Sequence, residues 1–207
     1  MLTISLHQHP LSLWPGTGWP DEYGEGAATG CAVNVALPPG TADAGWLRAF
    51  DALVPSLLTA FRPQLLVTQC GVDTHAEDPL ANLELSVDGH RTIYRKLRDL
   101  AERTAGGRWL ALGGGGYGLY RVVPRSWTHL LATVLDRDVD PRSPMPAGWV
   151  AYASRLTSHQ LPPEMTDGAD VAHAPWLIGT DRVDVAILET RRAVFPLHGL
   201  DPHDPRD

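Results

Sequence analysis

Short apolar runs alternate along the first two thirds of the chain with longer stretches whose apolar residues have helical spacing. The short runs predict buried β-strands at residues 2–6, 31–37, 65–68 and 109–112. Apolar side chains three or four positions apart predict helices over about 43–61, 90–103 and 122–135. This order of strands and helices predicts an α/β fold, a parallel sheet with helices on both faces.

Two of these helices carry more detailed expectations. Asp43 stands where it can cap the first helix, and Pro55 within that helix is expected to kink it. The residues expected to be buried by the third helix are Val123, Trp127, Leu130, Leu131 and Val134.

The character of the sequence changes after Asp136. Nine of the 18 prolines fall in the last 72 residues, which predicts a tail that wraps the domain and contains one late helix over about 181–194. We therefore expect a single domain over 1–207, with a sheet core in 1–135 and the wrapping tail in 136–207.

Composition excludes several classes of protein. Apolar residues make up 43% and charged residues 20%, as in ordinary globular domains, and the net charge is −7. The basic residues are 16 Arg and a single Lys96, spread without a basic run, so no nucleic-acid face is expected. No apolar stretch approaches the ~20 residues of a membrane helix. Cys31 and Cys70 cannot form a disulfide framework, and no secretory signal is readable, so the cytoplasm is the expected location.

Candidate chemistry follows the last two predicted strands. Ligands gather at the carboxyl ends of parallel strands, and Asp73 lies just beyond one of these ends, where it suits either a metal ligand or the cap of a turn. Residues 113–118 follow the other strand. Their four consecutive glycines let backbone approach a ligand closely, and Tyr117 offers a hydroxyl donor. The same segment fits G-x-G-x-x-G, so a nucleotide-binding oxidoreductase is an alternative.

Two other features bear on function. The segment 10–30 is a long Gly- and Pro-rich loop, which is more often functional than idle. His7 and His9 would lie on one face of an extended strand, a spacing that metals use, although a surface position is the favoured interpretation.

Three ordered segments resemble a known family. Residues 15–18 read Pro-Gly-Thr-Gly after Ser-Leu-His at 5–7, residues 69–73 read Gln-Cys-Gly-Val-Asp, and residues 112–117 read Leu-Gly-Gly-Gly-Gly-Tyr. In this order they resemble the second half of an enzyme of the histone deacetylase superfamily, which has an arginase/deacetylase-like fold. Residues 71–80 and 193–202 are similar to its acetoin utilisation branch.

The resemblance implies a zinc-dependent hydrolase that removes the acetyl group from acetyl-lysine in proteins or from related acetylated small amines. Zinc would polarise the acetyl carbonyl. By position, Asp73 matches the last zinc ligand of the family and Tyr117 matches the tyrosine that stabilises the oxyanion. The Ser5 hydroxyl and the Leu6 carbonyl match part of a potassium or sodium site beside the zinc.

The resemblance also implies a narrow tunnel for the acyl-lysine chain. Trp14 and Leu80 match its walls, and Gly116 would let it close around an aliphatic chain.

The chain departs from the family in one large respect. The paired histidines and the Asp-x-His segment, which supplies the other two zinc ligands, have no counterpart, and His75 is not expected to replace them. We therefore expect a carboxyl-terminal portion that is inactive alone and binds neither ion tightly. The alternative is a non-catalytic remnant or a subunit that pairs with a separate amino-terminal half, since an unpaired apolar strand edge seeks a partner.

Overall fold

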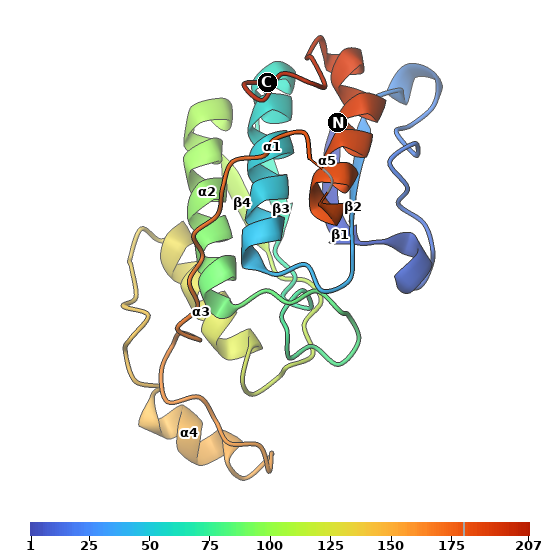
Figure 1. Ribbon diagram of the computed structural model, residues 1–207. Coiled ribbons are helices and arrows are strands. Elements are labelled where there is room, and N and C mark those ends of the chain that lie inside the picture. The colour runs from blue at the N-terminus through green and yellow to red at the C-terminus, as the bar shows by residue number, and fades with distance from the viewer. Residues whose placement is uncertain (180) are drawn as a thin grey trace. The chain divides into compact units, whose positions relative to one another are not determined.

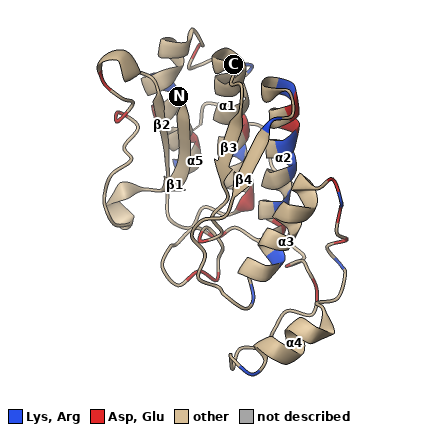
Figure 2. Ribbon diagram, turned by 180° about the vertical axis from the view of Figure 1, so that it is seen from behind, with Lys and Arg blue, Asp and Glu red and all other residues tan. Residues whose placement is uncertain are grey.

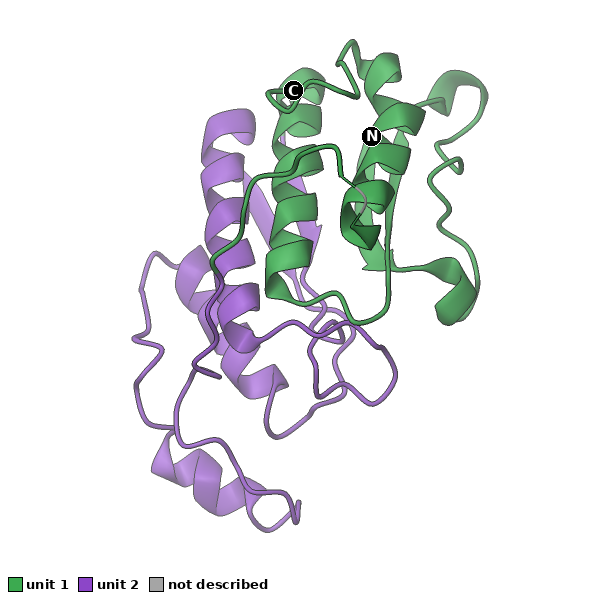
Figure 3. Cartoon of the chain, in the orientation of Figure 1, with its two compact units in different colours: residues 1–64, 172–207 green, residues 65–171 purple. Residues whose placement is uncertain are grey.

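The computed structural model describes residues 1–179 and 181–207, which form two compact units (Figures 1 and 3). One unit comprises residues 1–64 and 172–207, and the other comprises residues 65–171. Each unit holds one two-stranded parallel sheet packed with helices, so the chain has the expected α/β fold. Each helix in the described part is too short or too polar to cross a bilayer.

The first unit is built on strands β1 (Thr3–Gln8) and β2 (Ala32–Leu37). They pair in parallel, with Ser5 opposite Asn34 and Leu6 opposite Val35. Helix α5 (Arg182–Val194) packs against β2 and against helix α1 (Asp43–Phe61), as Figure 2 shows from the strand side. Short 3₁₀ turns lie at Pro10–Ser12, Gly26–Ala28 and Phe195–His198.

Helix α1 has the predicted limits, but its cap differs from the prediction. The N-cap residue is Ala42, which makes no side-chain hydrogen bond, and Asp43 is the first helical residue. Asp43 therefore does not act as the cap. The helix continues through Pro55.

Hydrogen bonds from Arg191 hold the carboxyl-terminal segment 201–207 against the first unit. Its guanidinium is fully buried and donates to the carbonyl oxygens of Ala52 (2.6 Å), Asp204 (2.5 Å) and Asp207 (2.9 Å), among others. Burial lowers the pKa of Arg191 to about 10, although three nearby aspartates oppose the shift. Backbone carbonyls thus take the place of water around a buried charge.

The second unit holds strands β3 (Leu66–Gln69) and β4 (Trp109–Leu112), also paired in parallel. Helices α2 (Val87–Ala105) and α3 (Val123–Val134) pack on each other, and α2 contacts β4. One hydrophobic cluster in the core of this unit is formed by Cys70, Tyr94 and Leu130, against which Leu97, Trp109, Ala111 and Trp127 pack.

Three expectations for this unit are corrected by the structure. Helix α2 begins earlier than predicted because the Ser86 hydroxyl accepts a hydrogen bond from the Gly89 amide and caps it. Leu131 and Val134 on α3 are exposed rather than buried. A further helix, α4 (Ala147–Ala153), lies in the segment predicted to hold only one late helix.

A polar network ties Asp167, which is partly exposed, to buried residues of the second unit. Asp167 accepts hydrogen bonds from His75 Nε2 (3.0 Å), the Val87 amide (2.8 Å) and Arg125 Nη1 (2.6 Å). Burial alone would raise the pKa of Asp167, but these hydrogen bonds and the charge of Arg125 hold it well below the usual range. The ionised carboxylate therefore stabilises this unit.

We predict that Asp167→Asn lowers the free energy of unfolding by about 2–3 kcal/mol at pH 7, because it leaves Arg125 buried without its anion. A native pKa below the unfolded value of 3.8 gives stabilisation that is complete above about pH 4 and is lost as the pH falls toward the native pKa. The difference between the variant and the parent protein in urea unfolding should therefore shrink below pH 4.

Asp138→Asn is the control, since Asp138 pairs with Arg91 and Arg95 at the surface, where an ion pair contributes about 1 kcal/mol or less. A pH-independent difference would contradict this role of Asp167.

Candidate active site

The candidate site of the second unit lies where β3 and β4 end. The two strands are parallel, so the loops that follow them leave from the same edge of the sheet. The Cys70 amide donates to the Leu112 carbonyl (2.8 Å), and the Val72 amide donates to the Gly115 carbonyl (2.7 Å). Backbone pairing thus continues past the strands and brings loop 71–81 beside the glycine run 113–116.

The glycines permit this approach because side chains of β3 and of loop 71–81 occupy the space beside them. A Cβ atom on Gly115 would lie 2.0 Å from Oδ2 of Asp73, and one on Gly114 would lie 2.4 Å from the amide of Gln69. Gly116 has a φ of +150°, and a Cβ atom there would lie 2.5 Å from Cγ2 of Val72. The run is therefore explained by packing within the protein, without a dinucleotide.

Asp73 lies partly buried against this run. Burial raises the pKa of its carboxyl group, a hydrogen bond from its own backbone opposes the shift, and the charge of Asp78 raises the pKa further. A carboxylate in such surroundings favours a bound proton or a cation.

The expected site residues divide between the units. The second unit holds Asp73, Leu80, Gly116 and Tyr117, and the loops that carry them are brought together. The side chains of Leu80 and Tyr117 are 60% and 50% exposed, which leaves both accessible.

The first unit holds the other three expected residues. Ser5 and Leu6 are consecutive on β1, and Trp14 is 89% exposed in the loop after the 3₁₀ turn Pro10–Ser12.

The residues present do not by themselves fit a catalytic zinc. A catalytic zinc takes three protein ligands and keeps a fourth position open. Within residues 1–179 and 181–207, no group of three His, Cys, Asp or Glu side chains is arranged to hold a metal ion. His75 is engaged elsewhere, with Nε2 on Asp167 and Nδ1 accepting from the Glu77 amide (3.0 Å). The ring atom Nδ1 of His7 contacts the Gln8 carbonyl, and Nδ1 of His9 accepts a hydrogen bond from the Leu11 amide.

A chain of buried hydrogen bonds begins at Thr74, next to Asp73, and was not predicted from the sequence. The hydroxyl of Thr74 contacts His90 Nε2 (2.8 Å), and His90 Nδ1 contacts the Ser126 hydroxyl (3.0 Å), which also contacts the Tyr94 hydroxyl (2.8 Å). Burial lowers the pKa of His90 to about 3, so its imidazole is neutral. The one signal in the sequence was the spacing of His90, Ile93 and Tyr94 on one face of a helix.

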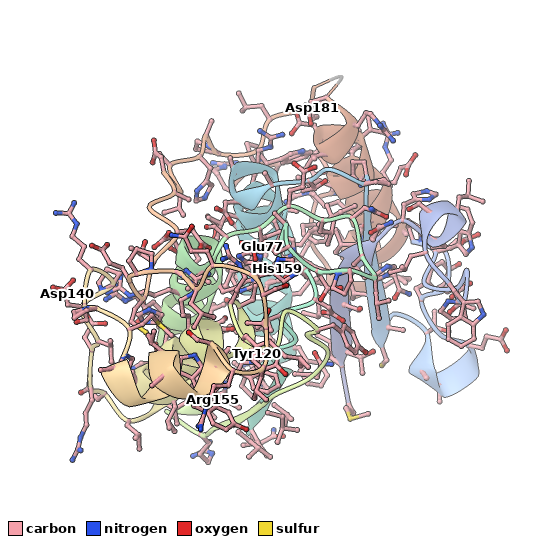
Figure 4. All side chains as sticks on the ribbon, turned by 90° about the horizontal axis from the view of Figure 1, so that it is seen from below. Glu77, Tyr120, Asp140, Arg155, His159 and Asp181 are labelled. Atoms are coloured by element: carbon pink, nitrogen blue, oxygen red, sulfur yellow. The ribbon has the colours of Figure 1, made fainter. Side chains whose placement is uncertain are left out.

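A second missed contact lies on the outside of the same loop. Arg121 makes a bidentate ion pair with Glu77 (2.6 and 2.8 Å) and also donates to the Gln160 carbonyl. Figure 4, which views the molecule from below, labels Glu77 of this loop and His159 of the segment after α4. These contacts tie loop 71–81 to the segment after α4.

Comparison with known proteins identifies the family to which this arrangement belongs. The profile of the histone deacetylase domain matches residues 1–134. The chain belongs to the histone deacetylase family. It is 33% identical over 169 residues to the acetoin utilization protein AcuC of Bacillus subtilis, which supports the acetoin utilisation branch. It is also 35% identical over 139 residues to a probable deacetylase of Archaeoglobus fulgidus.

Solved structures agree with this histone deacetylase fold. The HDA15 HD domain has a TM-score of 0.59 at 29% identity over 75% of this chain and 42% of its own. The histone deacetylase Clr3 has a TM-score of 0.70 at 20% identity over 100% of this chain and 30% of its own, which shows the fold alone. The two sequence relatives cover 82% and 67% of this chain, which in turn spans 43% and 38% of their length.

We predict that Gly115→Ala displaces Asp73, because the added methyl group would overlap its carboxylate. Overpacking of this kind costs about 1–3 kcal/mol in the free energy of unfolding. Amide chemical shifts of residues 71–78 should move in the variant and report the displacement. Gly148→Ala is the control, since a Cβ there meets no atom within 4 Å, and it should leave those shifts unchanged. Unchanged shifts in both variants would show that the two loops are farther apart than described.

Proposed function

We propose that this chain carries the tyrosine-bearing part of a zinc-dependent deacetylase that acts on acetyl-lysine or related acetylated amines. The observation that carries the proposal is the pairing of loop 71–81 with the glycine run, which brings the segments of Asp73 and Tyr117 to one edge of a parallel sheet. Membership of the histone deacetylase family supports the same reaction.

In this proposal each residue of the second unit has a distinct task. The exposed phenol of Tyr117 donates a hydrogen bond to the oxyanion that forms when the acetyl carbonyl is attacked. Asp73 supplies one carboxylate ligand for the metal ion. Leu80 and Gly116 line the path of the aliphatic lysine arm.

For three residues of the first unit we propose the roles that their positions in the family pattern imply. Ser5, through its hydroxyl, and Leu6, through its carbonyl, take part in a potassium or sodium site, and Trp14 forms a wall of the substrate tunnel. Support for these assignments is their match to the family pattern.

We further propose that the enzyme is complete only with additional polypeptide. Asp73 is one ligand of the three that a catalytic zinc needs, and the relatives are more than twice as long as the matched part of this chain. An amino-terminal half would supply the remaining ligands and the general acid and base. The expected substrates are cytoplasmic acetylated proteins or acetylated small amines. A nucleic-acid partner is not expected, because the net charge of the chain is −7.

We predict that the chain alone releases no acetate from an acetyl-lysine peptide, and that mixing it with an amino-terminal half taken from the Bacillus subtilis relative restores the reaction. In the restored enzyme, Tyr117→Phe should lower kcat by about 10²–10³-fold, because one oxyanion donor is lost. Acetate release under saturating peptide measures both effects.

The matched control is Tyr120→Phe, which removes a hydroxyl three residues away and should leave kcat within about twofold. Acetate release by the chain alone that is abolished by Tyr117→Phe would overturn the requirement for a second half. Equal activity of the Tyr117→Phe variant and the parent protein in the restored enzyme would overturn the role of the phenol.

A second candidate function, that of a subunit without its own activity, is favoured by one feature of the β3–β4 sheet. Trp109 and Ala111 pack toward the core, so Leu110 and Leu112 point to the opposite face of β4. Leu110 and Leu112 are each 47% exposed, and Val67 on β3 is 52% exposed. Parallel sheets are normally covered on both faces, so we propose that an apolar segment of a partner chain packs here.

We predict that Leu110→Gln combined with Leu112→Gln weakens association with the amino-terminal half at least tenfold, because apolar area that would be buried is lost. Calorimetric titration of the two halves measures the change. Leu131→Gln is the control, since Leu131 is even more exposed (59%) but lies on α3. Equal affinities for all three proteins would exclude this face as the contact.

A further inference from the structure

Asp78 is a buried carboxylate whose two oxygens serve two different segments of the second unit. Oδ1 accepts hydrogen bonds from the amides of Leu80 (2.9 Å) and Ala81 (3.3 Å) in its own loop. Oδ2 accepts a hydrogen bond from the amide of Tyr117 (3.0 Å), 39 residues away. Asp78 is only 9% exposed, so water does not compete strongly for these donors.

The loop that carries Asp78 is itself anchored. The Asp78 amide donates to the His75 carbonyl (2.9 Å), and the His75 side chain is fixed by Asp167 and by the Glu77 amide. Asp167 in turn contacts Arg125, which has no exposed surface. The carboxylate of Asp78 is therefore a fixed point to which Tyr117 is attached.

Tyr117 needs such an attachment because of the residues that precede it. The close approach of the two loops requires glycine at 114, 115 and 116, and glycine restrains the backbone least of all residues. A phenol that follows this run would otherwise move with it. The hydrogen bond from the Tyr117 amide to Asp78 is formed at the first residue after the run, where it limits that motion.

We propose that Asp78 is a positioning residue for Tyr117. It holds the backbone of Tyr117 in register with loop 71–81 and thereby fixes the phenol relative to Asp73. This inference rests on the proposed function of Tyr117, but the attachment itself can be tested without any catalysis.

The first experiment measures amide hydrogen exchange at Tyr117 in this chain. In the parent protein the Tyr117 amide should be protected, although its side chain is half exposed. Asp78→Asn should speed its exchange at least tenfold, because an asparagine has one carbonyl oxygen and cannot serve donors in both segments. Asp138→Asn, a surface control, should leave the Tyr117 amide unchanged.

Two results of this experiment would overturn the proposal. One is exchange of the Tyr117 amide in the parent protein as fast as in an unstructured peptide, which needs no variant to fold. The other is a uniform increase at all amides of the second unit in Asp78→Asn, since that would assign Asp78 a general structural role.

The second experiment uses the restored enzyme and a double-mutant cycle. Asp78→Asn should lower kcat about tenfold and leave KM within about twofold, whereas in the Tyr117→Phe background it should change kcat less than twofold because the group it positions is gone. Additive effects would overturn the proposal. If the restored enzyme hydrolyses no acetyl-lysine, the proposed function fails, and the exchange experiment still decides whether Asp78 holds Tyr117.

Discussion

The hydrogen bond from the Val72 amide to the Gly115 carbonyl is the interaction on which the candidate site depends. It extends the pairing of β3 and β4 beyond the sheet and forces two loops into contact at their backbones. At that separation Gly115 has no room for a side chain, because the carboxylate of Asp73 occupies the space. The identity of the glycines and the position of the acid are thus two results of one backbone contact.

This arrangement balances freedom against restraint. Each glycine in an ordered segment costs about 0.5–1 kcal/mol of conformational entropy relative to alanine. A hydrogen bond to a charged group contributes about 1.5–3 kcal/mol. Asp78 makes one such bond to the Tyr117 amide, and the neutral bond from the Val72 amide to the Gly115 carbonyl adds about 1 kcal/mol, so loop 71–81 supplies the restraint that the glycine run lacks. The backbone of Tyr117 is therefore restrained by loop 71–81, which also carries Asp73.

The sequence predicted those parts of the structure that depend on local pattern. The limits of α1 and β4 follow from apolar spacing and from Pro and Gly at their ends, and both were predicted as observed. The exposure of Leu131 could not be predicted, because spacing identifies an apolar stripe but not how much of it a neighbour covers.

The same distinction applies to the candidate site. Strand ends located the segments of Asp73 and Tyr117 because parallel strands end at a common edge. No local pattern indicated the contact of Asp78, since an aspartate before a proline resembles any solvated turn, and its partner amide is 39 residues away. The contact between His75 and Asp167 spans 92 residues and was hidden for the same reason.

The uneven covering of the β3–β4 sheet connects the fold with the length of the relatives. On one face of β4, Trp109 and Ala111 are partly buried against the core cluster, while on the other face Leu110 and Leu112 are half exposed. Antiparallel sheets commonly tolerate a solvated face, and they place polar residues on it. Here the exposed face is apolar on a parallel sheet, and the chain spans 43% of the Bacillus subtilis relative. The additional polypeptide proposed above would cover this face and supply the metal ligands that the described residues 1–179 and 181–207 do not bring together.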